Sequence, residues 1–255
     1  MMQEKRVALV TGGASGIGKE IVKEMLENWY DVCTFDINEE GLHSVQHEFA
    51  QLGRLSICAG DVGDEQDVAR CVKDTIKSFG RIDVLVNNAG GSFHINGSVE
   101  TIAPDDWDKV VRLNLRNQFL FIHEVVPFMK ERRYGRIVCM SSKAGRSRGS
   151  GNSGSPYTAA KAGILGLVRQ ASADLGPFGI TVNAVAPGVI MSGERIRSYW
   201  AKRSPEDVAA QMKNIPVGRF GVSEDVAYAV LFLCGEKASF ITGVVIDVNG
   251  GAWVG

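Results

Sequence analysis

Short apolar runs alternate with longer amphipathic segments along most of this 255-residue chain. The short runs are rich in Val, Ile and Leu, which is typical of strands buried on both faces of a sheet. We predict seven strands, at Val7 to Val10, Val32 to Phe35, Leu55 to Ala59, Val84 to Val86, Arg136 to Met140, Thr181 to Val185 and Val244 to Val248. Strands that alternate with helices in this way predict a doubly wound α/β fold, a parallel sheet between helices.

The amphipathic segments predict six helices. They are Ile17 to Asn28, Glu39 to Leu52, Glu65 to Ser78, Asp105 to Lys130, Pro156 to Leu175 and Ser223 to Cys234. Two segments lack both patterns: Ser147 to Ser155, which is rich in Gly and Ser, and Met191 to Pro216. Because long excursions in compact domains are often lids or binding loops, we predict a substrate lid at about 191–216.

The composition fits a single domain that spans residues 1–255. With 45% hydrophobic and 22% charged residues, the chain can bury one sizeable core, and no repeat, linker or low-complexity tract divides it. The formal net charge of -1 gives no overall basic field for nucleic acid or an anionic membrane surface. We therefore expect neither nucleic acid nor a membrane as a partner.

The cysteines and histidines do not form a metal-binding pattern. None of the five cysteines has C-x-x-C spacing, and several lie in apolar segments, so we predict buried, reduced thiols. His43 and His47 lie four residues apart, but no Cys or third His joins them, and we predict no metal. The N-terminus lacks the apolar region of a signal peptide, and no stretch reaches the ~20 apolar residues of a membrane span. We expect a cytoplasmic protein.

A glycine-rich turn follows the first predicted strand and precedes a helix. It contains Gly12, Gly16 and Gly18. Glycine lets backbone amides approach a pyrophosphate, which then lies at the N-terminus of the helix. The spacing departs from G-x-G-x-x-G, and a glycine turn alone is a weak signal. Its position directly after the first strand favours a dinucleotide site.

Asp36 lies just past the second predicted strand, where an acidic side chain can accept hydrogen bonds from ribose hydroxyls. The same charge would repel a 2′-phosphate, and neither Ser15 nor Ile37 is an Arg or Lys that would attract one. We therefore predict NAD rather than NADP as the cofactor. The alternative is that Asp36 is an ordinary turn residue.

Tyr157 and Lys161 are four residues apart on a predicted helix, so their side chains share one face. A neighbouring positive charge favours the phenolate form of tyrosine, so such a pair can exchange a proton with an alcohol oxygen near neutral pH. By itself this spacing also occurs in solvated surface pairs. The rest of the chain decides between these interpretations.

Several further motifs occur in a defined order along the chain. They are Thr11-Gly12-x-x-x-Gly16-x-Gly18, Asp61-Val62, Asn87-Asn88-Ala89-Gly90, Asn114, Ser142, Tyr157-x-x-x-Lys161, Asn183, Pro187-Gly188-Val189-Ile190, Ile241-Thr242-Gly243 and Asn249-Gly250-Gly251. With these motifs the chain resembles the short-chain dehydrogenase/reductase family over nearly its whole length. The resemblance implies a Rossmann-type fold, a small-molecule alcohol or ketone as substrate, and a homotetramer formed through the helices near Asp105 and Pro156.

The resemblance also implies roles for single residues. Tyr157 would be the general acid/base, Lys161 would lower its pKa and hold the nicotinamide ribose, and Ser142 would bind the substrate oxygen. Asn114 would hold a water of a proton relay. The cofactor-binding residues implied are Gly12, Ser15, Gly16, Ile17, Gly18, Asp36, Asp61, Val62, Asn88, Ala89, Gly90, Tyr157, Lys161, Pro187, Gly188, Ile190 and Ser192.

Some of these residues have structural alternatives. Asn114 could cap backbone groups where its helix bends, and Ser142 could be a turn hydroxyl after the fifth strand. Ser141 also competes with Ser142 for alignment, because the gap of 15 residues to Tyr157 (157 − 142) is two longer than in most relatives. Asn87 and Asn183 could be catalytic-site or purely structural hydrogen-bonding groups.

The lengthened loop and the predicted lid carry several cations, namely Lys143, Arg146, Arg148, Arg195 and Arg197. We infer that the substrate has an anionic group, bound by Lys143, Arg148 or Arg195, because arginine matches the geometry of carboxylate and phosphate. The alternative is that these side chains are solvated.

Four other side chains have undecided positions. Phe93 and His94 follow the fourth strand and could line the site or, for Phe93, pack in the core. Trp200 and Met212 could cover the substrate or pack the lid.

The sequence thus predicts an NAD-dependent enzyme that interconverts a secondary alcohol and a ketone, with an anionic or polyol-like substrate. One alternative is a 3-oxoacyl thioester reductase, and a second is a nucleotide-sensing regulatory protein without catalysis.

Overall fold

The seven predicted strands are present and form one parallel sheet, in a computed structural model that describes residues 5–149 and 153–255. The strands are β1 (Arg6–Thr11), β2 (Tyr30–Asp36), β3 (Leu55–Ala59), β4 (Val84–Asn87), β5 (Gly135–Met140), β6 (Ile180–Pro187) and β7 (Val245–Val248). Their order across the sheet is β3-β2-β1-β4-β5-β6-β7, and every neighbouring pair is parallel. The predicted doubly wound α/β architecture is therefore confirmed.

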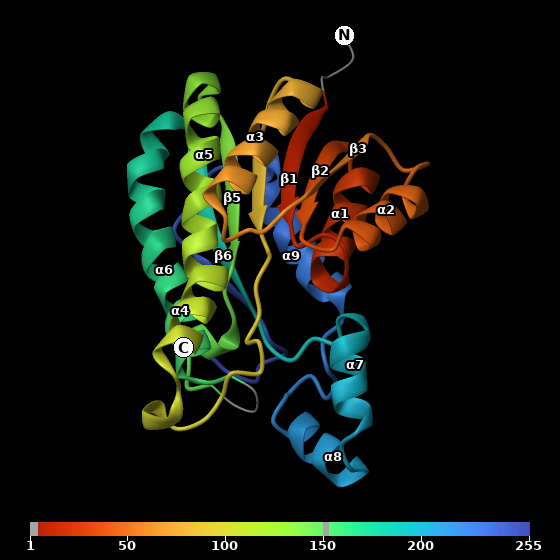
Figure 1. Ribbon diagram of the computed structural model, residues 1–255, viewed down its shortest axis with the longest axis vertical. Coiled ribbons are helices and arrows are strands. Elements are labelled where there is room, and N and C mark those ends of the chain that lie inside the picture. The colour runs from red at the N-terminus through yellow and green to blue at the C-terminus, as the bar shows by residue number, and fades with distance from the viewer. Residues whose placement is uncertain (1–4, 150–152) are drawn as a thin grey trace.

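Helices cover both faces of the sheet (Figure 1). They are α1 (Gly16–Glu27), α2 (Glu39–Glu48), α3 (Glu65–Phe79), α4 (Pro104–Val111), α5 (Asn117–Arg132), α6 (Ser155–Leu175), α7 (Gly193–Ala201), α8 (Pro205–Lys213) and α9 (Ser223–Cys234). One apolar core joins α3, α5 and α6 to the sheet, with Phe121 and Ile164 fully buried. The other joins α1, α2 and α9, with Met25 and Val226 fully buried. Burial of each such side chain contributes about 1.5–3 kcal/mol.

The chain reverses direction across the sheet between β1 and β4. From the centre it runs outward through β2 and β3, then returns to β4 on the other side of β1. Ligands of open α/β sheets bind at this reversal, beyond the carboxyl ends of the strands. The turns that follow β1 and β4 carry Gly12 and Asn88, so the fold brings the predicted cofactor motifs to this position.

The prediction of one continuous helix from Asp105 to Lys130 is wrong. After α4, residues Arg112–Arg116 form a π-helical turn, η2, and α5 then begins at Asn117. The side-chain amide of Asn114 donates to the carbonyl of Val110 at 2.9 Å. A buried amide that takes a backbone acceptor competes with regular helical bonding, and π turns of this kind occur frequently at functional sites.

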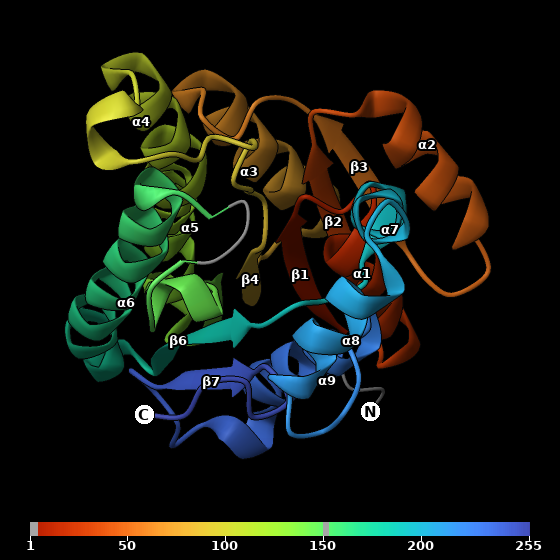
Figure 2. The same ribbon diagram turned by 90° about the horizontal axis from the view of Figure 1, so that it is seen from below.

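Two other predicted boundaries need correction. The second helix ends at Glu48 rather than at Leu52, and the following residues form turns. The segment 191–216 is not irregular but contains α7 and α8, which project from the carboxyl edge of the sheet (Figures 1 and 2). Pro205 at the start of α8 and the Ser204 side chain that caps Asp207 are local signals for that helix.

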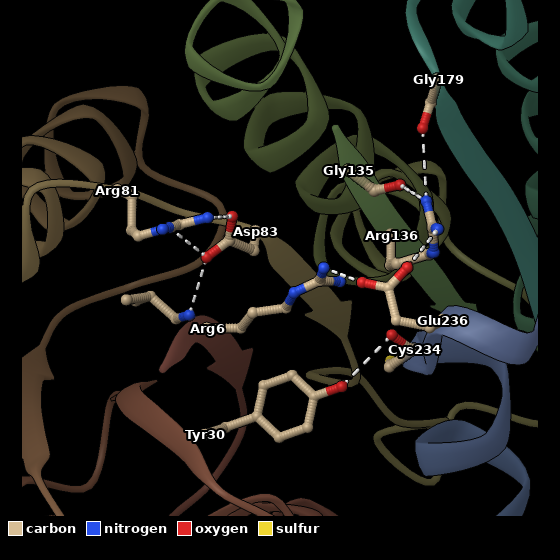
Figure 3. A network of polar contacts seen from close by, with 10 residues as sticks. Arg6, Tyr30, Arg81, Asp83, Gly135, Arg136, Gly179, Cys234 and Glu236 are labelled. Atoms are coloured by element: carbon tan, nitrogen blue, oxygen red, sulfur yellow. Dashed lines mark hydrogen bonds and ion pairs between the residues drawn. The ribbon is translucent and has the colours of Figure 1, made fainter. Parts of the chain in front are cut away.

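Charged side chains tie the amino edge of the sheet together, away from the glycine turn (Figure 3). The carboxylate of Asp83 is fully buried. It accepts a hydrogen bond of 2.9 Å from the backbone N–H of Val7 and one of 2.7 Å from Nε of Arg81. This contact fixes the start of β1 against the residue that precedes β4.

A second carboxylate at the same edge joins the segment after α9 to the sheet (Figure 3). Glu236, just after α9, pairs with Arg6 and, at 3.8 Å, with the buried Arg136. Both guanidinium groups lie over the ring of Tyr134, at 3.9 and 4.4 Å from its centroid. Burial lowers the pKa of Arg136, so paired carboxylate and ring contacts are needed to hold this cation.

All five cysteines are free and buried, as predicted. Within the described ranges, no cluster of three or more His, Cys, Asp or Glu side chains could hold a metal ion. The same residues include no helix with the length and apolar character needed to cross a membrane.

Candidate active site

A cavity of about 1100 Å³ lies at the carboxyl edge of the sheet, between the glycine turn and the α7–α8 segment. It brings together every residue predicted to bind the cofactor, along with Ser142. The set comprises Gly12, Ser15, Gly16, Ile17, Gly18, Asp36, Asp61, Val62, Asn88, Ala89, Gly90, Ser142, Tyr157, Lys161, Pro187, Gly188, Ile190 and Ser192. Of the predicted catalytic residues, only Asn114 is absent from the lining.

The glycine turn is held in place by close backbone contacts. Gly12 and Gly16 have positive φ angles of 73° and 59°, which favour glycine. A Cβ atom at Gly18 would lie 1.9 Å from the carbonyl oxygen of Gly12, so only glycine fits there. The Asn88 side chain donates to the carbonyls of Thr11 and Gly12 at 3.0 and 3.3 Å. Asn88 therefore fastens this turn to the end of β4, besides lining the cavity.

The N-terminus of α1 suits a phosphate group. Within the described part of the chain, the Ser15 side chain makes no capping hydrogen bond, and the first turn of α1 has no acidic residue. The first backbone N–H groups of a helix carry partial positive charge and lack intrahelical partners. These donors, beside Gly16, fit the pyrophosphate of a dinucleotide.

Asp36 links this turn to the end of β2. Its Oδ2 accepts from the backbone N–H of Ala14 at 3.0 Å, and its Oδ1 accepts from that of Asn38 at 3.0 Å. Each carboxylate oxygen keeps a further lone pair for a hydroxyl donor. The adjacent Ile37 is exposed and apolar, and it also lines the cavity. This end of the cavity therefore fits an uncharged ribose edge better than a phosphate.

Tyr157 and Lys161 lie on one face of α6, as the spacing predicts. The ammonium nitrogen of Lys161 is 5.6 Å from the centroid of the Tyr157 ring. Lys161 is buried, and burial lowers the pKa of its ammonium to about 8, while the neighbouring Cys139 thiol opposes this shift. Its nitrogen donates to the carbonyl of Met140 at 2.8 Å. The cation is therefore held at the end of β5, under the phenol.

Gln118 belongs to this arrangement and was missed in the sequence. Its side-chain amide donates at 3.1 Å to the same carbonyl of Met140 that Lys161 uses. The side chain is fully buried, and the Asn87 amide donates to the Gln118 backbone carbonyl at 3.2 Å. Gln118 lies four residues after Asn114, and this helical spacing was the available signal.

The two adjacent serines after β5 have different environments. The hydroxyl of Ser141 is buried and donates to the backbone carbonyl of Lys161 at 2.8 Å. The hydroxyl of Ser142 instead accepts from the N–H of Ala144 at 3.1 Å, and both serines line the cavity. An accepting hydroxyl keeps its own hydrogen for donation, so the geometry favours Ser142 as the group that meets a substrate oxygen.

Asn114 is not in the cavity lining, and its side-chain amide both accepts from and donates to the backbone of Gly91. Its Oδ1 accepts from the N–H of Gly91 at 3.0 Å, and its Nδ2 donates to the Gly91 carbonyl at 2.9 Å. Together with the bond to Val110, both amide hydrogens are used. This observation supports the capping alternative for the side chain, and the role in a water relay stays a prediction.

The cations predicted to bind substrate do not converge on the principal cavity. Lys143 and Arg148 line a side cavity of about 100 Å³, which also includes Ser142. The guanidinium of Arg146 forms an ion pair with Asp247 at 3.3 Å and lies over the ring of Trp253. The side chain of Arg195 lies outside the described part of the structure.

Arg203, between α7 and α8, lines the principal cavity, and it was not among the cations predicted from the sequence to bind substrate. Among the described lining residues, it and Lys161 are the only lysine or arginine. Its guanidinium lies 4.8 Å from the centroid of the Tyr199 ring and donates to the Tyr199 hydroxyl at 2.6 Å. Its place between α7 and α8 left no periodic signal for its orientation.

The turn after β4 also faces the cavity. Phe93 and His94 line it, and both have positive φ angles, 53° and 58°. Such angles cost a non-glycine residue about 1–2 kcal/mol each, and strain of this kind is commonly found at functional sites. Trp200 on α7 lines the cavity and packs on Phe220 at a centroid distance of 4.7 Å, so it joins α7 to the segment that precedes α9. Met212 is not in the lining.

Comparison with known proteins agrees with this geometry. A family model described as enoyl-(acyl carrier protein) reductase matches residues 12–252. A subunit of (2S)-[(R)-hydroxy(phenyl)methyl]succinyl-CoA dehydrogenase from Thauera aromatica is 38% identical over 249 residues, which cover 97% of this chain and 96% of that protein. A 3-oxoacyl-[acyl-carrier-protein] reductase from Thermotoga maritima is 36% identical over 253 residues, with 98% and 99% covered.

Solved structures match equally well. Levodione reductase superimposes with a TM-score of 0.89 at 32% identity, covering 96% of each chain. A 3-oxoacyl-[acyl-carrier protein] reductase from Brucella melitensis with bound NAD gives a TM-score of 0.88 at 35% identity, covering 99% of this chain and 93% of that one.

The fold and the site are those of a nicotinamide-dependent oxidoreductase. The chain belongs to the short-chain dehydrogenase/reductase family of these enzymes.

Proposed function

We propose that the protein interconverts a secondary alcohol and a ketone by hydride transfer with NAD. The observation that carries this proposal is the cavity itself. It has the glycine turn and Asp36 at one end, and Tyr157 and Ser142 at the other, with the Lys161 ammonium 5.6 Å from the phenol ring. A dinucleotide held along this path has its reactive ring beside a proton-exchanging group.

The residues of the chain would divide the chemistry as follows. When bound, the nicotinamide ring accepts or supplies the hydride. Tyr157 takes the hydroxyl proton of the alcohol, or returns it to the ketone oxygen, as general acid/base. Ser142 donates a hydrogen bond to the same oxygen, and Lys161 stabilises the phenolate by its charge.

A substrate panel tests the proposal directly. Polyols, sugar acids, hydroxy acids and sulfonated alcohols are incubated with NAD or NADP at alkaline pH, and absorbance of the reduced nicotinamide is followed. Appearance of that band together with a ketone product supports the proposal. No change with any alcohol, and none with the matching ketones and reduced cofactor, would instead favour the non-catalytic, nucleotide-sensing alternative.

A 3-oxoacyl thioester reductase is the second candidate. It is favoured by the relatives of that name, which are 36% identical over nearly the whole chain. The carboxylate of Asp36 opposes only an NADPH-dependent form of this activity, because that charge disfavours a 2′-phosphate. Reduction of a 3-oxoacyl thioester with NADPH at a higher kcat/KM than any NAD-linked alcohol oxidation would establish this candidate.

We further propose that the substrate carries an anionic group. Arg203 supports this, since it lines the cavity and offers guanidinium donors of the geometry that carboxylates and phosphates need. Lys143 and Arg148 remain candidates through the side cavity that shares Ser142.

A homotetramer is proposed from the family resemblance. Exposed aromatic side chains on the predicted interface helices support it, namely Trp107 on α4 and Phe119 on α5. Light scattering on the purified protein gives the mass directly, and a monomer at micromolar concentration would contradict this assembly.

A further inference from the structure

Arg112 is the first residue of the π-helical turn, and its side chain contacts the loop after β3. Its Nη2 lies 3.0 Å from Oδ2 of Asp61, and its Nε donates to the carbonyl of Gly63 at 3.2 Å. The other carboxylate oxygen, Oδ1, accepts from the backbone N–H of Gly63 at 2.8 Å. The guanidinium therefore contacts both the side chain and the backbone of one short loop.

The loop has a sequence that admits this contact. A Cβ atom at Gly63 would lie 2.7 Å from the guanidinium carbon of Arg112, so a larger residue there would displace the arginine. Arg116, one turn later, also donates to the Gly63 carbonyl, at 3.3 Å, but pairs with Glu65 instead of Asp61. The two arginines thus share one acceptor and differ in the carboxylate they hold.

The turn that carries Arg112 is itself fixed. Asn114, two residues later, makes three hydrogen bonds to the backbone of Gly91 and Val110. Asn114 is fully buried. The arginine therefore extends from a rigid support toward a loop at the far side of the cavity.

Asp61 lies where the base of a dinucleotide would lie. It lines the cavity beyond β3, whereas Lys161 and Ser142 lie beyond β5 and β6 at the other end. Asp36 on β2 lies between them and also lines the cavity. Each Asp61 oxygen has one protein donor and keeps a lone pair that can accept from an amine.

We propose that Arg112 is a positioning residue that fixes the Asp61 carboxylate as an acceptor for the exocyclic amine of adenine. The pair is substantially exposed, with 44% and 32% of the two side chains accessible, so it contributes little to folding stability. Its effect is on orientation. A carboxylate held in this direction attracts the adenine amine and repels the carbonyl oxygen that hypoxanthine has at the same place. The inference rests on the proposed dinucleotide site.

The experiment compares the dissociation constants of NADH and of reduced nicotinamide hypoxanthine dinucleotide, measured by fluorescence titration, so that no substrate is required. We expect the wild-type protein to prefer NADH. In Arg112→Met this preference falls about threefold to tenfold, because one charge-assisted hydrogen bond orients the acceptor. Arg112→Lys keeps the charge but has a single donor group, and it should restore only part of the preference.

Arg116→Met is the matched control, because it removes the neighbouring arginine without touching Asp61. We expect its preference to equal that of the wild type, with a similar melting temperature for all variants. Asp61→Asn places an amide donor opposite the base and should favour hypoxanthine.

The outcomes distinguish the role of Arg112 from the existence of the dinucleotide site. If Arg112→Met weakens both dinucleotides by the same factor, or changes neither, Arg112 has no positioning role. If Asp61→Asn shifts the preference while Arg112→Met does not, the base site stands and the role of Arg112 falls. A wild-type protein that binds neither dinucleotide overturns the proposed function and this inference together.

Discussion

The ammonium nitrogen of Lys161 lies 5.6 Å from the centroid of the Tyr157 ring and is held there by a 2.8 Å hydrogen bond to the carbonyl of Met140. The two residues lie on consecutive turns of α6, and the hydrogen bond to the end of β5 fixes the position of the ammonium group. A charge kept at this distance in a buried position acts on the phenol more strongly than it would in water.

Removal of the phenolic hydroxyl tests this relationship. We expect Tyr157→Phe to lower kcat by about 100-fold to 10,000-fold, because the proton then has no positioned acceptor. The dissociation constant for NADH and the melting temperature should stay near the wild-type values. A variant that oxidises the alcohol found in the substrate panel at the wild-type rate would contradict the role of Tyr157.

Lys161 predicts a particular dependence of stability on pH. Its pKa is about 8 in the folded protein and 10.5 in the unfolded chain, so the cost of burying the charge is fully present below pH 8. Between these values the unfolded chain binds more protons, and stability from this group rises with pH, by an amount on the order of 3 kcal/mol at most.

Chemical denaturation of the wild type and Lys161→Met from pH 7 to 10 measures this effect. The difference between the two unfolding free energies should move in favour of the wild type as pH rises. Comparison with Lys161→Met is needed because burial also raises the pKa of Cys139 to about 12. Above pH 9 this thiol ionises more readily in the unfolded chain, so its contribution to stability falls as pH rises. A difference that is independent of pH would show that Lys161 titrates normally.

Asp36 predicts the choice of cofactor. Asp36→Asn removes the charge but leaves a side-chain oxygen that can accept from Ala14, and Ile37→Arg then adds a cation at an exposed position. We expect the double variant to raise the ratio of NADP to NAD binding by about tenfold to 100-fold, with a smaller rise in Asp36→Asn alone. Titration with both cofactors checks this, and an unchanged ratio would show that Asp36 does not discriminate at the 2′ position of the ribose.

Arg203 predicts how the lid recognises substrate. In Arg203→Ala, KM for an anionic substrate should rise about tenfold relative to its neutral ester or amide, as expected for loss of a charge-assisted hydrogen bond. Lys202→Ala, which removes the adjacent exposed cation, is the control. Equal changes for the anionic and neutral compounds would remove Arg203 from substrate binding.

The buried carboxylate at the amino edge predicts a large effect on stability without one on catalysis. Asp83→Asn removes the fully buried charge that pairs with Arg81 and should lower the free energy of unfolding by about 3–5 kcal/mol. Glu48→Gln breaks the exposed pair with Lys19 and should cost less than about 1 kcal/mol. Urea unfolding of both variants makes the comparison, and equal losses would show that burial does not govern the strength of these pairs.

Strands and the glycine turn were predictable because their signals are local. Apolar runs such as Val7 to Val10 indicate buried strands without knowledge of which strands pair with them. The positions of Gly12 and Gly18 follow from backbone contacts within one turn. The sequence offered a bend at Asn114 only as an alternative to a catalytic role, since this side chain bonds not only to the nearby Val110 but also to Gly91, 23 positions away.

The sequence by itself determined the alternation of strands and helices, the glycine turn after β1, and the shared face of Tyr157 and Lys161, because periodicity and short spacing are enough to specify them. Only the tertiary structure decided that Lys161 and Gln118 share the carbonyl of Met140, that Arg112 contacts Asp61, and that Arg203 faces the cavity. Each of these contacts joins segments brought together by the sheet order or by the docking of α7 and α8, and no local pattern encodes such distances.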